Sequence, residues 1–232
     1  MTTQTISSPE IYQGQFGEFR ITESDRQSVI IYRTGLTIAA LCFAIGSGLV
    51  LFYPQPVAIA ALTPLYTCFS IALGVSLLTI HIYMAFLHRI LQLFWIIGSI
   101  CAFIFGHGDS QAFAITIYHQ PLTILGIGFT FAALTGIFFK EGFCFHRLET
   151  KILTPLVPLL LLGHLTGILS TPAEQVLLAT WAILFLIFAV RKIIQPIPPD
   201  IGDKSVFDYL KNQIKTRRLE VTATQTKSAS AD

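Results

Sequence analysis

Six long apolar segments dominate the sequence and alternate with short connections that are polar or contain proline. A helix needs roughly 20 apolar residues to cross about 30 Å of hydrocarbon, and each segment is close to or above that length. The pattern therefore predicts an all-α fold, a polytopic membrane helix bundle with six transmembrane helices. The predicted spans are residues 34–53, 61–86, 90–106, 120–139, 152–170 and 174–190.

The positions of lysine and arginine agree with six spans. With this number, all 15 basic residues fall in the terminal segments and in the connections on one side of the membrane, and none falls on the other side. One span more or fewer would scatter them over both sides. Lysine and arginine accumulate on the cytoplasmic side of membranes. We therefore expect an integral membrane protein with both termini on the cytoplasmic or stromal side.

Composition narrows the functional classes. Charged residues make up 12% of the chain, against about 25% in soluble domains, and residues 34–88 contain none. The net charge of +2 is too small to favour a nucleic-acid partner. The four cysteines form no CxxC pair and are interpreted as small packing residues, without a disulfide framework. No nucleotide-binding or catalytic signature occurs. We expect no catalytic residues, no metal site and no cofactor.

The spans divide the chain into four parts: a cytoplasmic N-terminal segment (1–33), the transmembrane domain (34–190), an amphipathic segment (191–220) and a disordered tail (221–232). Residues 10–21 alternate aromatic and polar side chains around two glycines, which predicts an extended or turn segment at the membrane surface. Ser24 and Gln27 have the spacing of a capping box, so a helix is expected to begin there and continue into the first span.

Residues 203–219 predict a C-terminal amphipathic surface helix. Phe207, Leu210 and Ile214 share one face of this helix, and lysines occupy the rest. Such a pattern is typical of a helix that lies on an anionic lipid surface. It is equally suited to a helix docked against the inner connections of the protein itself, and the sequence leaves both interpretations open.

Small residues recur four positions apart in the first and fourth predicted spans. Helices in lipid associate where small side chains let their backbones approach, so these positions are candidates for packing within the bundle or for a self-association or partner face. Both spans also open with Leu-Thr-Ile, which raises the alternative of an inverted repeat with three spans per half. The helix-packing candidates are Ala40, Ala44, Gly48, Gly128, Ala132 and Gly136.

Histidines are the candidate acid–base groups of the spans. His164 lies about 20 Å along its span from Lys151, at 1.5 Å per residue, which places it near the middle of the membrane. At that depth it is either a functional residue or a neutral imidazole bonded to a neighbouring helix. His81 and His88 lie on one face of the second span but roughly 10 Å apart, too far to share a metal ion. A haem between His81 and His164 is the corresponding redox hypothesis.

The connection 140–151 carries the densest group of polar residues. Its functional candidates are Glu141, His146, Arg147 and Glu149. Glu141 is expected at the lipid boundary, where a carboxylate is costly unless it is paired with a cation. The segment is interpreted as a gate, a partner contact or a proton site, or as an ion-paired loop that closes the bundle. The connection 107–119 is expected as a loop on the opposite side.

Two segments, YQGQFG at 12–17 and KEGFCFHRLE at 140–149, resemble an uncharacterised family of integral membrane proteins (a domain of unknown function) from cyanobacteria and plastids. The resemblance covers about residues 11–195. It implies a membrane of a photosynthetic organism, such as the thylakoid or plasma membrane, and it carries over no catalytic residue.

These features give three functional hypotheses. The first is a non-catalytic assembly, scaffold or regulatory component of a membrane complex, with the lipid bilayer and other membrane protein subunits as its partners. The alternatives are a small-solute transporter or channel with His164 in the bundle, and an intramembrane haem or redox protein.

Overall fold

The computed structural model describes residues 10–82, 84–107, 113–207, 209–210, 212–213 and 215. The chain forms two compact units. Residues 30–195 form a helical bundle, and the segments before residue 30 and after residue 195 form a smaller unit. The disordered tail predicted at 221–232 lies outside the described residues.

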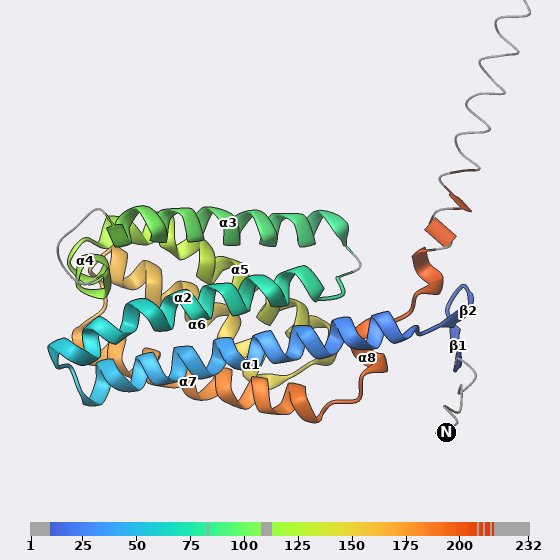
Figure 1. The fold of residues 1–232 in the computed structure, drawn as a ribbon, viewed down its shortest axis with the longest axis horizontal. Coiled ribbons are helices and arrows are strands. Elements are labelled where there is room, and N and C mark those ends of the chain that lie inside the picture. Colours follow the sequence, from blue (N-terminus) through green and yellow to red (C-terminus); the bar gives the residue numbers. More distant parts are fainter. Residues whose placement is uncertain are drawn as a thin grey trace, which may run out of the picture. The chain divides into compact units, whose positions relative to one another are not determined.

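Six long helices make up the bundle (Figure 1). Among the described residues, all six are long and apolar enough to cross a membrane, which confirms the predicted number of spans. The short helices are α4 (Phe113–His119), the 3-10 helix η1 (Pro121–Thr123) and α8 (Pro198–Ile201). The long helices are α1 (Glu23–Phe52), α2 (Pro56–Thr79), α3 (Ala85–His107), α5 (Ile124–Phe145), α6 (Leu148–Leu165) and α7 (Thr171–Ile194).

The cap of α1 differs from the predicted one. The Thr22 amide donates to Asp25 Oδ2 at 2.8 Å, and the Asp25 amide donates to Thr22 Oγ1 at 3.2 Å. This reciprocal pair is a capping box, and it stands two residues before the predicted pair of Ser24 and Gln27. An aspartate at the third position accepts the same bond that a longer glutamine side chain would accept.

The two connections expected as loops are largely helical. α4 occupies the second half of segment 107–119. α5 continues to Phe145 and α6 begins at Leu148, so only two residues separate these helices. α2, in contrast, ends earlier than predicted. Its backbone becomes extended at Ile80 (ψ 136°), whereas the second span was predicted to end at residue 86.

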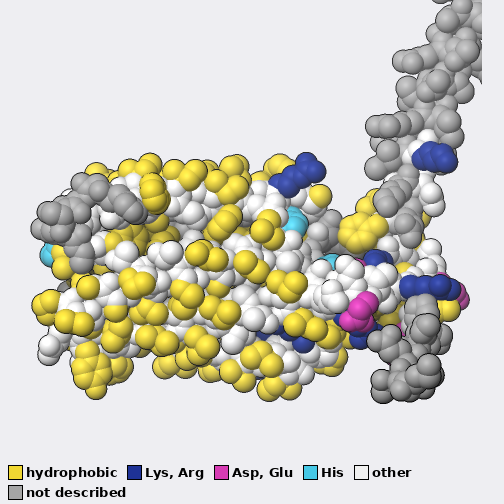
Figure 2. Space-filling model, in the orientation of Figure 1, with side chains coloured by type: hydrophobic (Ala, Val, Ile, Leu, Met, Phe, Trp, Pro, Cys, Tyr) yellow, Lys and Arg dark blue, Asp and Glu magenta, His cyan; other side chains and the backbone are white. Residues whose placement is uncertain are grey.

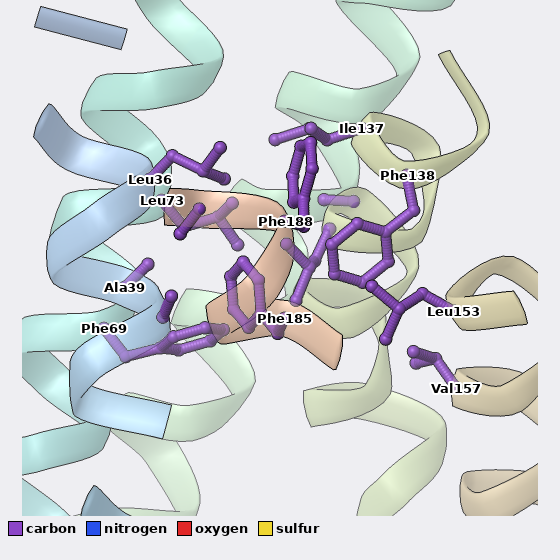
Figure 3. Close-up of a cluster of buried hydrophobic side chains, with 14 of the residues drawn as sticks. Leu36, Ala39, Phe69, Leu73, Ile137, Phe138, Leu153, Val157, Phe185 and Phe188 are labelled. Atoms are coloured by element: carbon purple, nitrogen blue, oxygen red, sulfur yellow. The ribbon is translucent and has the colours of Figure 1, made fainter. Parts of the chain in front are cut away.

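The centre of the bundle is a cluster of apolar side chains from all six long helices, part of which is drawn in Figure 3. Leu36 of α1 and Leu73 of α2 are fully buried there. Phe138 of α5 packs edge-to-face against Phe185 and Phe188 of α7, with ring centroids 5.2 and 5.7 Å apart. Hydrophobic side chains also cover the outside of the bundle along its length in Figure 2. A surface of that kind fits a lipid environment.

Close helix approach occurs at glycines, but only partly at the predicted ones. A Cβ on Gly98 of α3 would lie 2.4 Å from the Thr130 backbone nitrogen of α5, and one on Gly136 would lie 2.2 Å from Leu91. Such contacts are typical of packing between membrane helices. A Cβ on Gly48 would meet nothing within 4 Å, and one on Gly128 would meet only Ile124 of its own helix. Of the alanines in the predicted set, Ala40 is fully buried, and Ala44 and Ala132 are half-buried.

The smaller unit contains the extended segment predicted at 10–21. Strands β1 (Ile11–Gly14) and β2 (Gly17–Arg20) form an antiparallel hairpin. Asp203 accepts a hydrogen bond from the Gln15 amide at 2.6 Å. The pKa of this carboxyl lies below its ordinary value, because the Ser205 hydroxyl and the Gln15 amide both donate to it. Residues 211, 214 and 216–219 are not described, so the C-terminal amphipathic helix stays a prediction.

Candidate functional site

Glu141 is the centre of an ion-paired cluster inside the bundle. α5 continues through this residue, so its side chain is fully buried instead of lying in a loop. Lys192 of α7 donates to Oε2 at 2.6 Å, Lys140 donates to Oε1 at 2.9 Å, and the Tyr32 hydroxyl donates to Oε1 at 3.2 Å. The Lys192 ammonium also lies 4.4 Å from the centroid of the Phe145 ring. Each oxygen of the buried carboxylate therefore has a cationic partner, which offsets its desolvation.

Glu149 holds a second pair in the first turn of α6. Arg191 of α7 donates to its Oε2 at 2.9 Å, and Arg147 Nη1 lies 3.9 Å from its Oε1. Arg147 also donates to the Gln195 side chain. His146 takes a left-handed conformation (φ 51°) that ends α5, and its side chain is exposed. The two carboxylates together join α1, α5, α6 and α7 at the end of the bundle that carries the basic residues.

His81 lies outside the spans, because α2 ends at Thr79. It belongs to the connection between α2 and α3, and the prediction that placed it within the second span is wrong. His88 stands in the first turn of α3, where its Nε2 lies 2.6 Å from the Leu77 carbonyl oxygen of α2 and 3.1 Å from the Gln92 amide nitrogen. The His88 ring thus joins the end of α2 to the start of α3.

His164 stands in the last turn of α6 and not near mid-membrane, since α6 begins at Leu148 and ends at Leu165. Its Nδ1 lies 2.6 Å from Glu174 Oε1 in the first turn of α7, and its Nε2 lies 3.2 Å from the Tyr118 carbonyl oxygen of α4. This is the end of the bundle opposite His81, across the length of α2. A haem held between His81 and His164 does not fit this placement.

A cavity of about 410 Å³ extends from the His164–Glu174 pair into the bundle. Six helices contribute to its wall: α1, α2, α4, α5, α6 and α7. Most of the wall is apolar and includes five aromatic residues. Its acid–base pair, His164 and Glu174, lies together with other polar residues at one end. The aromatic residues are Phe43, Tyr66, Phe69, Phe113 and Phe131, and the polar end has Tyr118, His164, Thr171, Glu174 and Gln175.

α1 and α2 pack more closely beside Gly35 than beside Gly46. Near the basic end they are in contact, since a Cβ on Gly35 would lie 2.7 Å from the Ala72 carbonyl oxygen. Further along α1, the nearest atom to a Cβ on Gly46 would be Leu62 Cδ2 at 3.4 Å, and both residues line the cavity. A Cβ at Gly35 would therefore meet the backbone of α2, whereas a Cβ at Gly46 would meet only side chains of α2.

Trp181 marks the inner limit of this space. Its ring packs against Phe43 and Phe131, two residues of the cavity wall, with centroid distances of 4.3 and 5.3 Å. The side chain is 2% exposed, and its Nε1 has no hydrogen-bond partner among the described residues. A buried donor left unpaired is unusual in a folded protein. Beyond Trp181 lies the packed core around Phe185 (Figure 3).

Sequence reasoning missed Glu174 and Tyr118 as members of the site. Glu174 carried a usable signal, because it is a carboxylate on the side of the membrane that has no lysine or arginine. It also follows His164 by ten residues across a short connection, so the two had to lie at the same end of adjacent helices. Tyr118 contributes a backbone carbonyl, and no sequence pattern marks such a contact.

A family of proteins described as uncharacterized integral membrane proteins (DUF2301) matches residues 75–209, more than half of the chain. The chain belongs to this family. The matched region includes Glu141, His164 and Glu174, but it leaves out α1 and most of α2. No curated protein and no solved structure matches the chain. Membership confirms the expected kind of family and, with the six apolar helices, an integral membrane protein. Its range in cyanobacteria and plastids and the side of the termini stay predictions.

Proposed function

We propose that this membrane protein binds a small, largely apolar molecule in the cavity, with the polar group of the ligand at the His164–Glu174 pair. The observation that carries the proposal is the cavity itself, about 410 Å³ in volume, with apolar walls and polar residues gathered at one end. Ligand sites in proteins are typically apolar clefts of roughly 300–1,000 Å³ with a few polar groups that orient the ligand. Both features are present here.

Transport of this ligand is a second candidate. It is favoured by the closed state of the opposite end of the bundle, where Glu141, Glu149 and their partners join four helices. A site near one end of the bundle, with the other end closed by ion pairs, fits the arrangement expected for alternating access. A role as an assembly or scaffold component of a membrane complex, which the sequence suggested, is a separate proposal. Affinity purification of the native protein tests it, and recovery without any specific companion subunit would contradict it.

The binding experiment uses tryptophan fluorescence. The chain has two tryptophans, so a Trp95→Phe background leaves Trp181, beside the cavity wall, as the reporter. A neutral probe, (6-bromonaphthalen-2-yl)methanol, combines an apolar body with a polar end and a bromine that quenches tryptophan on contact. We expect saturable quenching in protein reconstituted into lipid nanodiscs.

Two glycines of α1 supply the test variant and its matched control. Gly46→Leu places a side chain in the cavity, and Gly48→Leu places the same side chain where a Cβ meets nothing within 4 Å. Gly46→Leu should weaken the probe by at least about tenfold, equivalent to 1.4 kcal/mol, and Gly48→Leu should leave it unchanged. Quenching that does not saturate, or that both variants reduce alike, would show mere partition into lipid and would refute the proposal.

A further inference from the structure

We infer that the ligand of this cavity is a lipophilic cation that takes the place of the proton shared by His164 and Glu174. The inference rests on the proposed function and specifies the chemical class of the ligand. It follows from three observations: the hydrogen bonds of the imidazole, the charges around the cavity, and the aromatic character of its wall.

The hydrogen bonds fix how many protons the pair holds. A carbonyl oxygen only accepts, so the Nε2 that faces Tyr118 must carry a hydrogen. A second proton then lies between Nδ1 and the Glu174 carboxylate, 2.6 Å apart. The C-terminal end of α6 favours a positive His164 and the N-terminal end of α7 favours a negative Glu174. The pair therefore holds two protons in total and has no net charge.

A cation can replace this proton without changing the charge of the cavity. When a positive ligand approaches Glu174, His164 releases the proton at Nδ1 and keeps the Nε2 hydrogen for Tyr118. One cation enters and one proton leaves, so the sum of charges is constant. An anionic ligand would instead add a negative charge to a wall that contains no lysine or arginine. Burying such a charge unpaired is strongly unfavourable.

We assign the exchange of proton and cation to His164 and Glu174 and not to the other titratable side chains near them. Among the described residues, the other titratable side chains of the wall are a thiol and two phenols, and none is a carboxylate, an imidazole or an amine. The His119 ring lies beside Tyr118, with centroids 5.6 Å apart, and belongs to the end of α4. In the part of the chain that the structure describes, the titratable groups of the wall and this neighbour are Cys42 of α1, Tyr66 of α2, Tyr118 and His119 of α4, His164 of α6 and Glu174 of α7.

The aromatic wall suits the body of such a ligand, and the Tyr118 ring, whose centroid lies 4.9 Å from that of His164, stands beside its charge. Faces of aromatic rings attract organic cations, most strongly where water is excluded. Phe43, Phe69 and Phe131 contact one another with centroid distances between 5.7 and 6.4 Å, and Tyr66 joins Phe113 at 5.1 Å. These rings line the space into which the body of the ligand would extend. Carboxylate and rings together are the usual partners of quaternary and tertiary ammonium groups.

The test compares two probes that differ only in their polar group: the bromonaphthyl alcohol and the corresponding bromonaphthylmethyl-trimethylammonium ion. Quenching of Trp181 is measured for both in the Trp95→Phe background. The ammonium probe should bind at least about tenfold more tightly than the alcohol at high pH. Its affinity should fall as the pH falls, by at most about tenfold per pH unit, because protons compete with it. The alcohol should show no such dependence.

The protons released on binding are also measured directly, so that the test does not depend on whether the variants fold. A pH-indicator dye in weak buffer should report one proton released per ammonium ion bound, and none for the alcohol. Glu174→Gln should remove the preference for the ammonium probe, and His164→Gln should remove its pH dependence. If the alcohol binds saturably while the ammonium probe is no tighter or releases no proton, the inference fails and the proposed function stands. If neither probe saturates, both fail.

Discussion

Replacing Lys192 with methionine would remove the closest partner of the buried Glu141 carboxylate. The two side chains are 1% and 0% exposed, and the ammonium nitrogen lies 2.6 Å from Oε2. Breaking a buried ion pair by removing one partner typically costs about 3–5 kcal/mol, since the remaining charge stays buried. Lys140 and Tyr32 still bond the other oxygen, so we expect a loss of about 3 kcal/mol, at the lower end of that range.

The assay is unfolding by sodium dodecyl sulfate in mixed micelles, followed by tryptophan fluorescence. Lys151→Met is the matched control, because Lys151 is exposed on α6 and undergoes the same chemical change. The control should shift the free energy of unfolding by less than about 0.5 kcal/mol. Glu141→Gln in the Lys192→Met background should recover part of the loss, since it removes the uncompensated charge. Equal stability of Lys192→Met and Lys151→Met would refute the buried cluster.

Three further predictions address other parts of the chain. Reporters fused to the two termini should be accessible from the same side of the membrane, and opposite sides would overturn the six-span topology. Gly98→Ala should destabilise the bundle by more than about 1 kcal/mol while Gly48→Ala does not, because only the first Cβ would lie 2.4 Å from the backbone of α5; equal thermal stabilities would contradict this. The Asp203 pKa is lowered by donation from Ser205 and Gln15, so its contact with the hairpin should be complete at neutral pH and lost as pH falls below about 4. The chemical shift of the Gln15 amide reports this loss, and a shift independent of pH would contradict it.

The number and type of the spans could be predicted from the sequence because lipid offers the backbone no hydrogen-bond partners. Every apolar segment of about 20 residues must then satisfy its own backbone as a helix, whatever its neighbours are. The ends of the helices were less predictable, since polar residues there can still continue a helix. Residues 140–145 illustrate this: they looked like a loop by their charges, yet Glu141 stays in α5 because Lys192 neutralises it from another helix.

Only the tertiary structure decided which side chains meet. Lys192 reaches Glu141 from 51 positions away, and Tyr32 reaches it from 109. Such pairs depend on the rotation and crossing of whole helices, which the apolar pattern of a single span does not encode. Gly35 and Gly46 are the same residue type on the same helix, but the backbone of α2 lies against the first and only side chains of α2 lie near the second. The sequence by itself determined a six-span membrane protein, and the packing of six helices around a common space determined its cavity.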